Sequence, residues 1–270
     1  MSALIAHGAT LGSAPLADHL QKPYHLVAEM YDFMEHPKGE GETPITNRML
    51  VERFKKLGTR TILDMTCGTG NQTIPLRRAG FEVIGTDLNE AMLKVARRKG
   101  ASLGIEFRQA DMRTVSVGRF DAIISMYNAI GHLSCEDFER TARNAFEHLN
   151  PGGTYAFDIF NTAVVETMQE HEIIDSVAVR NDTKYVRFTR FRYDGTRRHV
   201  VVGQRTYIQK RYQQSPETID ESYSLQTYRK SQLEDVLRRS GFSAVSISGD
   251  GMQDVFGIPG VCHFAIATKA

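Results

Sequence analysis

Residues 61–70 read Thr-Ile-Leu-Asp-Met-Thr-Cys-Gly-Thr-Gly. The stretch 61–65 is short and apolar enough for a buried strand, and Gly68 and Gly70 give the backbone the freedom that a tight turn needs. Residues 72–78 follow as a helix that ends at Gly80. This order of strand, glycine-rich turn and helix favours a parallel sheet that binds a ligand beyond the carboxyl ends of its strands.

The same order repeats along the chain. Apolar runs predict further strands at residues 81–86, 105–109, 120–126, 153–157, 242–248 and 261–268. Three more helices are predicted, at 89–100 with Asn89 as its cap, at 134–150 with Ser134 as its cap, and at 231–240, where Ser231 and Glu234 form a capping box. We therefore expect a doubly wound, Rossmann-like α/β fold with a mostly parallel seven-stranded sheet.

The segments on either side of this core have different patterns. Residues 184–193, 199–212 and 217–228 predict three antiparallel strands inserted before the last helix, with a hairpin turn at Asp194-Gly195. Ahead of the core, helices are predicted at 23–34 and 43–57, after a flexible tail at 1–15. The expected domains are a tail with N-terminal cap helices at 1–57, a ligand-binding core at 58–170, an antiparallel insertion over the substrate site at 171–229 and the end of the core sheet at 230–270.

Composition argues against several classes of protein. The 270 residues include 33 basic and 32 acidic side chains, so bulk charge does not favour binding to a nucleic acid. The three cysteines are far apart and belong to no Cys/His cluster, which argues against a disulfide framework and against a metal site. No apolar run reaches the ~20 residues of a membrane helix, and the N-terminus has no basic leader, so we expect a cytoplasmic protein.

Two acidic residues follow predicted strands. Asp87 ends the second strand, where a carboxylate can accept hydrogen bonds from both hydroxyls of a ribose, and Asp111 follows the third. A dinucleotide fingerprint fails because Thr73 stands where its third glycine would be, and no P-loop sequence is present. The glycine turn combined with these two carboxylates is a stronger signal for a nucleotide-like ligand than the turn alone.

At these positions the chain resembles the class I methyltransferases that use S-adenosylmethionine. Residues 61–70 resemble the first motif of that family, and the segments 85–89, 109–112 and 120–124 resemble the next three. Leu149-Asn150-Pro151-Gly152-Gly153 resembles the turn before the family's fifth strand. The match covers about residues 61–160 and, more loosely, 231–270. Thr66 stands where many members carry glycine, at a position where the family accepts small residues.

The resemblance implies that the cofactor is S-adenosylmethionine. Residues 66–70 would hold its methionine part with support from Asp64, and Asp87 would bind the ribose. Asp111 would accept a hydrogen bond from the adenine amino group, beside the backbone N–H of Met112. The cofactor-binding residues expected on these grounds are Tyr24, Tyr31, Asp64, Thr66, Gly68, Gly70, Asp87, Leu88, Asp111, Met112 and Met126.

Methyl transfer from a sulfonium is an in-line displacement, in which the enzyme aligns the acceptor, excludes water and keeps the acceptor unprotonated. Tyr127, Asn128 and His132 follow the fourth strand and are the expected catalytic residues. His132 could take a proton from an amine, and the alternative is a capping or buried structural histidine. The Gly-His-Leu sequence around it resembles the aminosugar N,N-dimethyltransferases, while Tyr24 and Tyr31 resemble the N-terminal tyrosines of those enzymes and of glycine N-methyltransferase.

The insertion has nine Lys/Arg residues and one acidic residue between Lys184 and Arg211, with aromatic residues interleaved. A solvated strand face is the first interpretation, an anionic small substrate held by Arg190 and Arg192 is the second, and nucleic acid ranks third. Exposed strands of the insertion could also pair across a homodimer. The expected substrate-binding residues are Tyr127, Asn128, His132, Asp158, Phe160, Asn161, Arg190 and Arg192.

The first functional hypothesis is therefore an S-adenosylmethionine-dependent methyltransferase that acts on the nitrogen of a small molecule. An oxygen or carbon acceptor is the second. A third is cyclisation of the cofactor's own aminobutyrate part, which needs no external acceptor. A different class is a binding module: either a cofactor-sensing regulator, which would retain the same cofactor motifs, or a nucleic-acid binder that uses the arginine-rich insertion. The sequence does not name the substrate.

Overall fold

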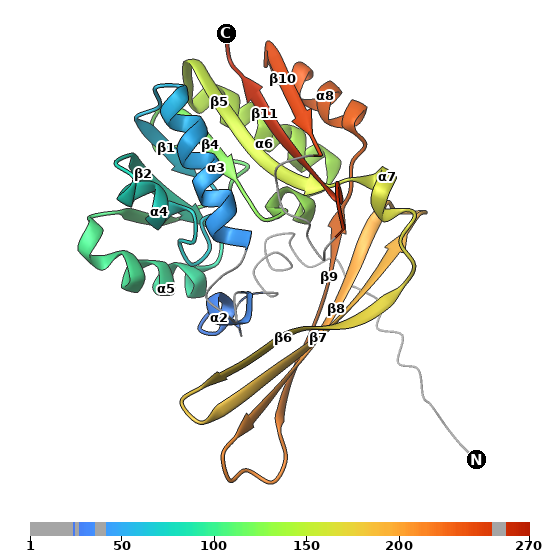
Figure 1. The fold of residues 1–270 in the computed structure, drawn as a ribbon. Helices are drawn as coiled ribbons and strands as arrows, with labels where there is room; N and C mark the ends of the chain where they lie inside the picture. Colours follow the sequence, from blue (N-terminus) through green and yellow to red (C-terminus); the bar gives the residue numbers. More distant parts are fainter. Residues whose placement is uncertain (1–23, 25–26, 36–41, 250–257) are drawn as a thin grey trace.

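The computed structural model describes residues 24, 27–35, 42–249 and 258–270, and the tail predicted at 1–15 lies outside them. Its core is a seven-stranded sheet in the order β10-β11-β5-β4-β1-β2-β3 (Figure 1). The five strands from β5 to β3 run parallel, while β11 is antiparallel to both β5 and β10. This confirms the predicted doubly wound, mostly parallel sheet. Its strands are β1 (Thr61–Asp64), β2 (Glu82–Asp87), β3 (Glu106–Gln109), β4 (Phe120–Ser125), β5 (Leu149–Phe160), β10 (Ala244–Ser248) and β11 (Cys262–Thr268).

Helices cover both faces of this sheet with their apolar sides. On one face, Leu50, Phe54 and Leu76 of α3 and α4 are buried against the strands. On the other face, α6 and α8 bury Phe138 and Leu237. Each such fully buried side chain contributes about 1.5–3 kcal/mol to folding. The core helices are α3 (Glu42–Lys56), α4 (Thr73–Arg78), α5 (Glu90–Gly100), α6 (Cys135–His148) and α8 (Lys230–Arg239).

Two of the predicted helix caps are present. The Asn89 side chain accepts hydrogen bonds from the first backbone N–H groups of α5, and the Ser134 hydroxyl accepts one from Asp137 in α6 (3.1 Å). Both caps set the helix start directly after a loop at the carboxyl edge of the sheet. The loops that follow β2 and β4 are thereby held in place at this edge.

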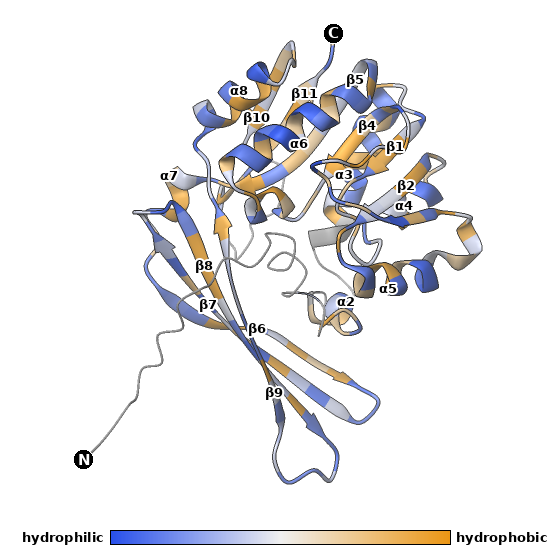
Figure 2. Cartoon of the chain, turned by 180° about the vertical axis from the view of Figure 1, so that it is seen from behind, coloured by the Kyte–Doolittle hydropathy of each residue, from blue (hydrophilic) through white to orange (hydrophobic). Residues whose placement is uncertain are grey.

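A second sheet lies beside the carboxyl edge of the core and projects away from it (Figures 1 and 2). It contains β6 (His171–Arg180), β7 (Thr183–Asp194), β8 (His199–Lys210) and β9 (Glu217–Gln226), all antiparallel in this order. One face carries Phe191, Val200 and Val202, which pack against Phe160 at the end of β5 and against Val165 of α7 (Thr162–Val165). We call this the inner face of the second sheet and the opposite one the outer face.

Three details differ from the sequence-based prediction. The strand β6 was not predicted, and its register with β7 shifts between Ile174 and Ser176. The first helix was predicted at 23–34. Among the described residues of that stretch, Tyr24 is helical, 27–30 form a turn, and α2 (Tyr31–Glu35) is helical. The last helix starts at Lys230, where Gln232 Oε1 accepts from the Arg229 N–H (2.9 Å), and not at the predicted Ser231–Glu234 box.

Among the described helices, none is both long and apolar enough to cross a bilayer. The described residues also hold no group of three or more His, Cys, Asp or Glu side chains arranged to bind a metal ion.

Candidate active site

The carboxyl group of Asp64 lies beneath the glycine-rich turn, at the end of β1. Its Oδ2 accepts a hydrogen bond from the Thr73 hydroxyl (2.7 Å), and its Oδ1 accepts one from the Thr66 N–H (3.4 Å). Burial raises the pKa of Asp64 to about 7, against the opposing effect of these two donors. Asp64 therefore ties the turn to α4 from below.

Gly68 and Asp87 connect the turn to the end of β2. The Gly68 backbone has a φ of +52°, which L-residues rarely adopt, and its N–H donates to Asp87 Oδ2 (2.8 Å). The other carboxylate oxygen of Asp87 accepts from the Asn89 N–H (2.8 Å). Burial raises the pKa of Asp87, and the N–H groups around it limit the rise. Since a carboxylate offers about four acceptor sites, Asp87 retains capacity for a ligand.

These groups form one wall of a pocket at the carboxyl ends of β1, β2 and β4. The empty space in the pocket is about 1010 Å³, with the open solvent at its mouth included. The structure brings together there the following residues that the sequence singles out: Tyr24, Tyr31, Thr66, Gly68, Asp87, Leu88, Asp111, Met112, Met126, Tyr127 and His132. Gly70 does not line the pocket; its φ is +86°, and an added Cβ would lie 3.0 Å from the Ile74 side chain.

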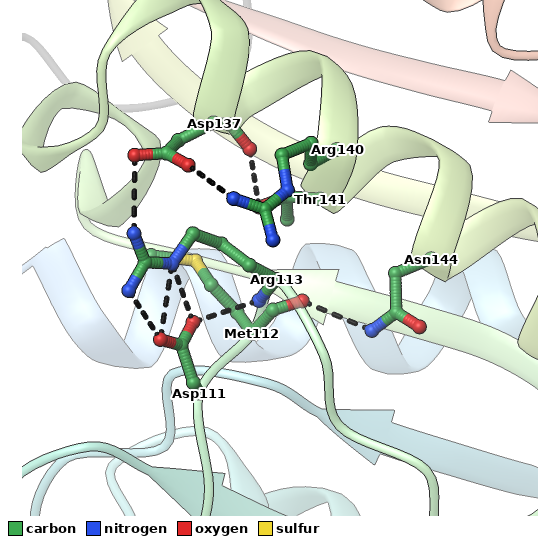
Figure 3. Close-up of polar contacts among 7 residues, drawn as sticks. All are labelled: Asp111, Met112, Arg113, Asp137, Arg140, Thr141 and Asn144. Atoms are coloured by element: carbon green, nitrogen blue, oxygen red, sulfur yellow. Dashed lines mark hydrogen bonds and ion pairs between the residues drawn. The ribbon is translucent and has the colours of Figure 1, made fainter.

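At the far end of the pocket, the Asp111 carboxylate is held by Arg113 (Figure 3). The Arg113 guanidinium and backbone N–H donate to both oxygens, at 2.5–3.0 Å, and the guanidinium also reaches Asp137 of α6 (3.1 Å). Burial alone would raise the pKa of Asp111, but Arg113 holds it below its usual value. An adenine amino group at this position would therefore share the carboxylate with Arg113, which the sequence-based role for Asp111 did not include.

The loop after β4 forms the opposite wall and has an unusual backbone. Tyr127 and Asn128 are consecutive residues with φ values of +60° and +57°. The buried Asp158 carboxylate accepts from the Asn128 N–H (2.9 Å), and Asn128 Oδ1 accepts from the Phe160 N–H (3.2 Å). These contacts stabilise a left-handed turn that costs of order 1–3 kcal/mol per residue. Asn128 and Asp158 thus position Tyr127 and do not line the pocket themselves.

His132 ends the short 3-10 helix η2 (Ala129–His132), directly beyond this turn. Its Nε2 lies 3.0 Å from the Tyr24 hydroxyl oxygen, and its ring lies 5.6 Å, centroid to centroid, from the ring of Tyr223 on β9. Tyr24 also contacts Tyr31, edge to face, at 5.9 Å. Burial lowers the pKa of His132 to about 4, so its imidazole is neutral at neutral pH. A neutral ring beside the pocket can accept a proton.

The N-terminal segment is attached to the pocket through α2. Asp32 accepts a hydrogen bond from the Thr69 hydroxyl of the glycine-rich turn (2.5 Å) and forms an ion pair with Lys99 of α5. Lys99 also donates to the Asn71 side chain (2.8 Å). The segment that supplies Tyr24 and Tyr31 is therefore held against the cofactor side of the molecule.

Six residues expected at the substrate do not line this pocket: Asn128 and Asp158, described above, and Phe160, Asn161, Arg190 and Arg192. Arg190 and Arg192 project from the outer face of β7, exposed, and Arg190 pairs with Glu172 (3.1 Å). The Asn161 side chain caps α7 by accepting from the Ala163 N–H (3.0 Å), and Phe160 packs in the apolar contact between the two sheets. Strand alternation places the two arginines on the face opposite the buried Phe191, which is why they lie away from the pocket.

The pocket also contains residues that sequence reasoning missed. Asn71 and Gln72 line it, and their position directly between the glycine turn and α4 is a signal that could have found them, because helix starts present N–H groups to ligands. Met92 lines it from α5, where it lies on the buried side of the helix. Tyr223 adjoins His132 from β9, and its alternating strand gives no local signal for that contact.

The groups in this pocket match those of S-adenosylmethionine. Asp87 can accept from the ribose hydroxyls, and the open backbone at Gly68 allows a ligand to approach closely. The Thr66 hydroxyl oxygen is buried and has no hydrogen-bond partner among the described residues, although it lines the pocket. A buried hydroxyl of this kind gains the hydrogen bond that it lacks when a polar group of a ligand binds beside it. The residues present therefore fit the cofactor.

Comparison with known proteins agrees with this fit. Residues 62–153 match the family model described as a methyltransferase domain. The putative methyltransferase YqeM of Bacillus subtilis (strain 168) is 28% identical over 233 residues, which cover 84% of this chain and 89% of that protein. The glycine/sarcosine N-methyltransferase of Halorhodospira halochloris is 33% identical over 136 residues, covering 48% of each chain.

Solved structures share the fold across nearly the whole chain. DesVI of Streptomyces venezuelae superposes with a TM-score of 0.76 at 20% identity, covering 90% of this chain and 98% of its own. The sugar N-methyltransferase KedS8 of Streptoalloteichus sp. ATCC 53650 has a TM-score of 0.72 at 21% identity, with 100% and 98% covered. The matched domain and the similar proteins show that this chain is a methyltransferase, on a Rossmann-like fold. The enzyme uses S-adenosylmethionine.

Proposed function

We propose that the enzyme methylates the nitrogen of a small-molecule amine. The observation that carries this proposal is the neutral His132, in contact with Tyr24, at the wall of the pocket formed by the loop after β4. An amine must be unprotonated to attack a methyl group, and a neutral imidazole has a free lone pair for its proton, whereas burial makes His132 a weaker base than an exposed histidine. The names of two similar proteins, a glycine/sarcosine N-methyltransferase and a sugar N-methyltransferase, also support a nitrogen acceptor.

The bound cofactor supplies a methyl group on a positively charged sulfur. In the proposal, Asp87 and the turn at 66–70 fix its position, while Tyr127 bounds the space that the acceptor enters. When His132 carries its proton on Nδ1, the Tyr24 hydroxyl donates to Nε2, which makes the Tyr24 oxygen a stronger acceptor for the N–H of the amine. The proton leaves the amine toward Tyr24 and His132 as the nitrogen is methylated.

The aromatic rings around His132 also exclude water from the reacting atoms. Tyr31 and Tyr223 both contact the Tyr24 ring, at centroid distances of 5.9 and 6.2 Å. Most of the rate enhancement in such a transfer comes from holding the acceptor in line, which is worth about 7–11 kcal/mol when the alignment is good. The acid–base contribution of the Tyr24–His132 pair is smaller, about 10²–10⁴-fold.

The test is a methyl-transfer assay with isotopically labelled S-adenosylmethionine. The acceptor panel contains primary and secondary amines, matched alcohols and matched phenols, with products followed by mass spectrometry. We expect label on nitrogen together with release of S-adenosylhomocysteine. Label on oxygen or carbon only would contradict the proposal, and so would cofactor loss without an acceptor, which indicates cyclisation. Tight cofactor binding with no turnover of any panel member would instead support a sensor.

A further inference from the structure

The inner face of the second sheet has a band of polar side chains between two apolar regions. On the core side of the band lie Phe191 and Val202, and on the distal side Tyr185 and Ile208 pack with Met34. The residues of this polar band are Asp175, Arg187, Thr189, Gln204 and Glu221. Buried polar side chains are costly unless they are paired, so each one in this band needs a partner.

Most members of the polar band satisfy one another. Arg187 Nε donates to both carboxylate oxygens of Asp175 at 3.0 Å, and the Thr189 hydroxyl donates to the same carboxylate (2.6 Å). The Gln204 amide in turn donates to the Thr189 hydroxyl oxygen (3.2 Å). The charge of Arg187 is thereby neutralised within the sheet, and this arginine does not present a free cation to a ligand.

Glu221 is different. It lies opposite Gln204 in the register of β8 and β9, and its Oε1 is buried without a hydrogen-bond partner among the described residues. Burial raises the pKa of Glu221 to about 7, with Arg187 acting in the opposite direction. The other members of the polar band are hydrogen-bonded to one another, so the unpaired carboxyl oxygen of Glu221 indicates a position where a ligand would donate a hydrogen bond.

The position of Glu221 relates it to the acceptor site. It precedes Tyr223 by two residues on the same strand, so both side chains are on the inner face, about 7 Å apart along β9. The Tyr223 ring contacts the rings of both His132 and Tyr24. Glu221 does not itself line the pocket. A ring-sized molecule whose nitrogen lies at Tyr24 and His132 would extend past the pocket along β9 and reach Glu221 with a substituent on its opposite side.

We propose that Glu221 determines acceptor specificity by binding a second hydrogen-bond donor, a hydroxyl or an ammonium group, on the side of the acceptor away from the methylated nitrogen. This inference rests on the proposed N-methylation and names the acceptor class as amines with a distal donor. Arg190 and Arg192 are exposed on the outer face, and Arg187 is neutralised by Asp175, so the described inner face favours donors over an anionic substrate.

The test measures binding with matched probes. Wild-type protein saturated with S-adenosylhomocysteine is titrated calorimetrically with cyclohexylamine, trans-4-aminocyclohexanol and trans-1,4-diaminocyclohexane. We expect the two probes with a second donor to bind about tenfold more tightly than cyclohexylamine, as one hydrogen bond to a carboxylate allows. Glu221→Leu should abolish both preferences. Glu221→Gln, which keeps the shape and one acceptor oxygen, should retain the preference for the hydroxyl and lose that for the second ammonium.

The control variant is Asp220→Leu, at the neighbouring outer-face position, where Asp220 pairs with Arg205. It should keep both preferences, and all variants should bind S-adenosylhomocysteine as wild type does. Equal affinities of wild type for the three probes, or a preference that survives Glu221→Leu, would overturn the inference. Methyl transfer to the same probes is measured in parallel. If the probes with a second donor bind more tightly but no amine is methylated, the proposed N-methylation is rejected and the donor-binding role of Glu221 stands. If amines are methylated but the three probes bind equally, the role of Glu221 is rejected.

Discussion

The Tyr24 hydroxyl lies 3.0 Å from Nε2 of His132, although 108 positions separate the two residues in the chain. Tyr24 precedes the core, and His132 follows β4 at the carboxyl edge of the main sheet. Tyr223 joins them from the second sheet. Three separate parts of the chain therefore meet at the point where the acceptor nitrogen is expected, so changes in any of them should affect turnover.

Replacing His132 should reduce turnover without affecting the cofactor. We expect His132→Gln to lower kcat by about 10²-fold or more, because Tyr24 loses the group that takes its proton. Steady-state kinetics together with calorimetric titration of S-adenosylhomocysteine will measure this. The matched control is His148→Gln, on the far side of the core in α6, which should leave kcat unchanged. A kcat for His132→Gln equal to that of wild type at every pH would exclude the relay through Tyr24.

Replacing Asp87 should weaken cofactor binding. Asp87→Asn removes one charged acceptor for the ribose and one for the Gly68 N–H, so we expect the cofactor to bind about 1–3 kcal/mol more weakly. Calorimetry with S-adenosylhomocysteine gives the difference directly. Glu90→Gln, three residues later and exposed, is the control and should bind as wild type does. An unchanged affinity for Asp87→Asn would refute the ribose assignment.

The buried Asp64 makes the stability of the cofactor-free protein depend on pH. Its pKa is about 7 in the folded chain and ~3.9 when unfolded, so between pH 4 and 7 the unfolded chain loses this proton first. The free energy of unfolding therefore falls as pH rises through this window, by up to about 4 kcal/mol. Asp64→Asn should flatten that fall, measured by urea unfolding at pH 5, 6, 7 and 8.

Asp121 provides a control of opposite sign. Burial would raise its pKa, but hydrogen bonds from Asn150, Thr61 and Arg60 hold the pKa below the usual value. Its ionised form stabilises the fold above about pH 4, and that stabilisation is lost as pH falls through the lowered pKa. Asp121→Asn should therefore reduce stability at neutral pH, where Asp64→Asn increases it. Parallel unfolding curves for Asp64→Asn and wild type across the pH range would contradict the shifted pKa.

The edge of the second sheet is the surface on which we expect a homodimer to form. β6 pairs only with β7 among the described strands, and Ile174, Val177 and Val179 on it are 58%, 50% and 68% exposed. An exposed apolar edge strand promotes pairing with another chain. Sedimentation velocity should show a dimer, and replacing these three residues with Lys should yield a monomer. The control is Thr218→Lys on β9, and a monomeric wild type would contradict the prediction.

The core, and most of the residues that line its pocket, could be predicted because their signals are local. A glycine turn, Asp87 and a capping Asn89 are each specified within a few residues, and parallel strands bring their carboxyl ends together at one edge. The second sheet could be predicted only in part. β6 escaped because its alternation is broken where the register shifts, near Ser176. Alternation alone also does not say which face of a strand is inward, so the sequence could not tell whether Arg190 lies on the inner or the outer face.

Contacts between distant segments could not be predicted from the sequence. Arg113 was not distinguishable from any other surface arginine, yet it holds Asp111 and alters how that carboxylate can meet an adenine. In the sequence, Tyr223 and Glu221 are ordinary strand positions. Only the three-dimensional structure places Tyr223 next to His132, with Glu221 two residues before it on β9. Long-range partners of this kind depend on packing, which local sequence patterns do not encode.

The aromatic cluster at His132 also provides an optical signal. The protein has no tryptophan, and three of its ten tyrosines, Tyr24, Tyr31 and Tyr223, lie together at this site. Without indole groups to absorb transferred energy, the ultraviolet emission of the protein comes from tyrosine alone, and three of the ten emitting side chains lie beside His132. Occupation of the pocket can therefore be followed in the unlabelled protein by its own fluorescence, during a single turnover as well as at equilibrium.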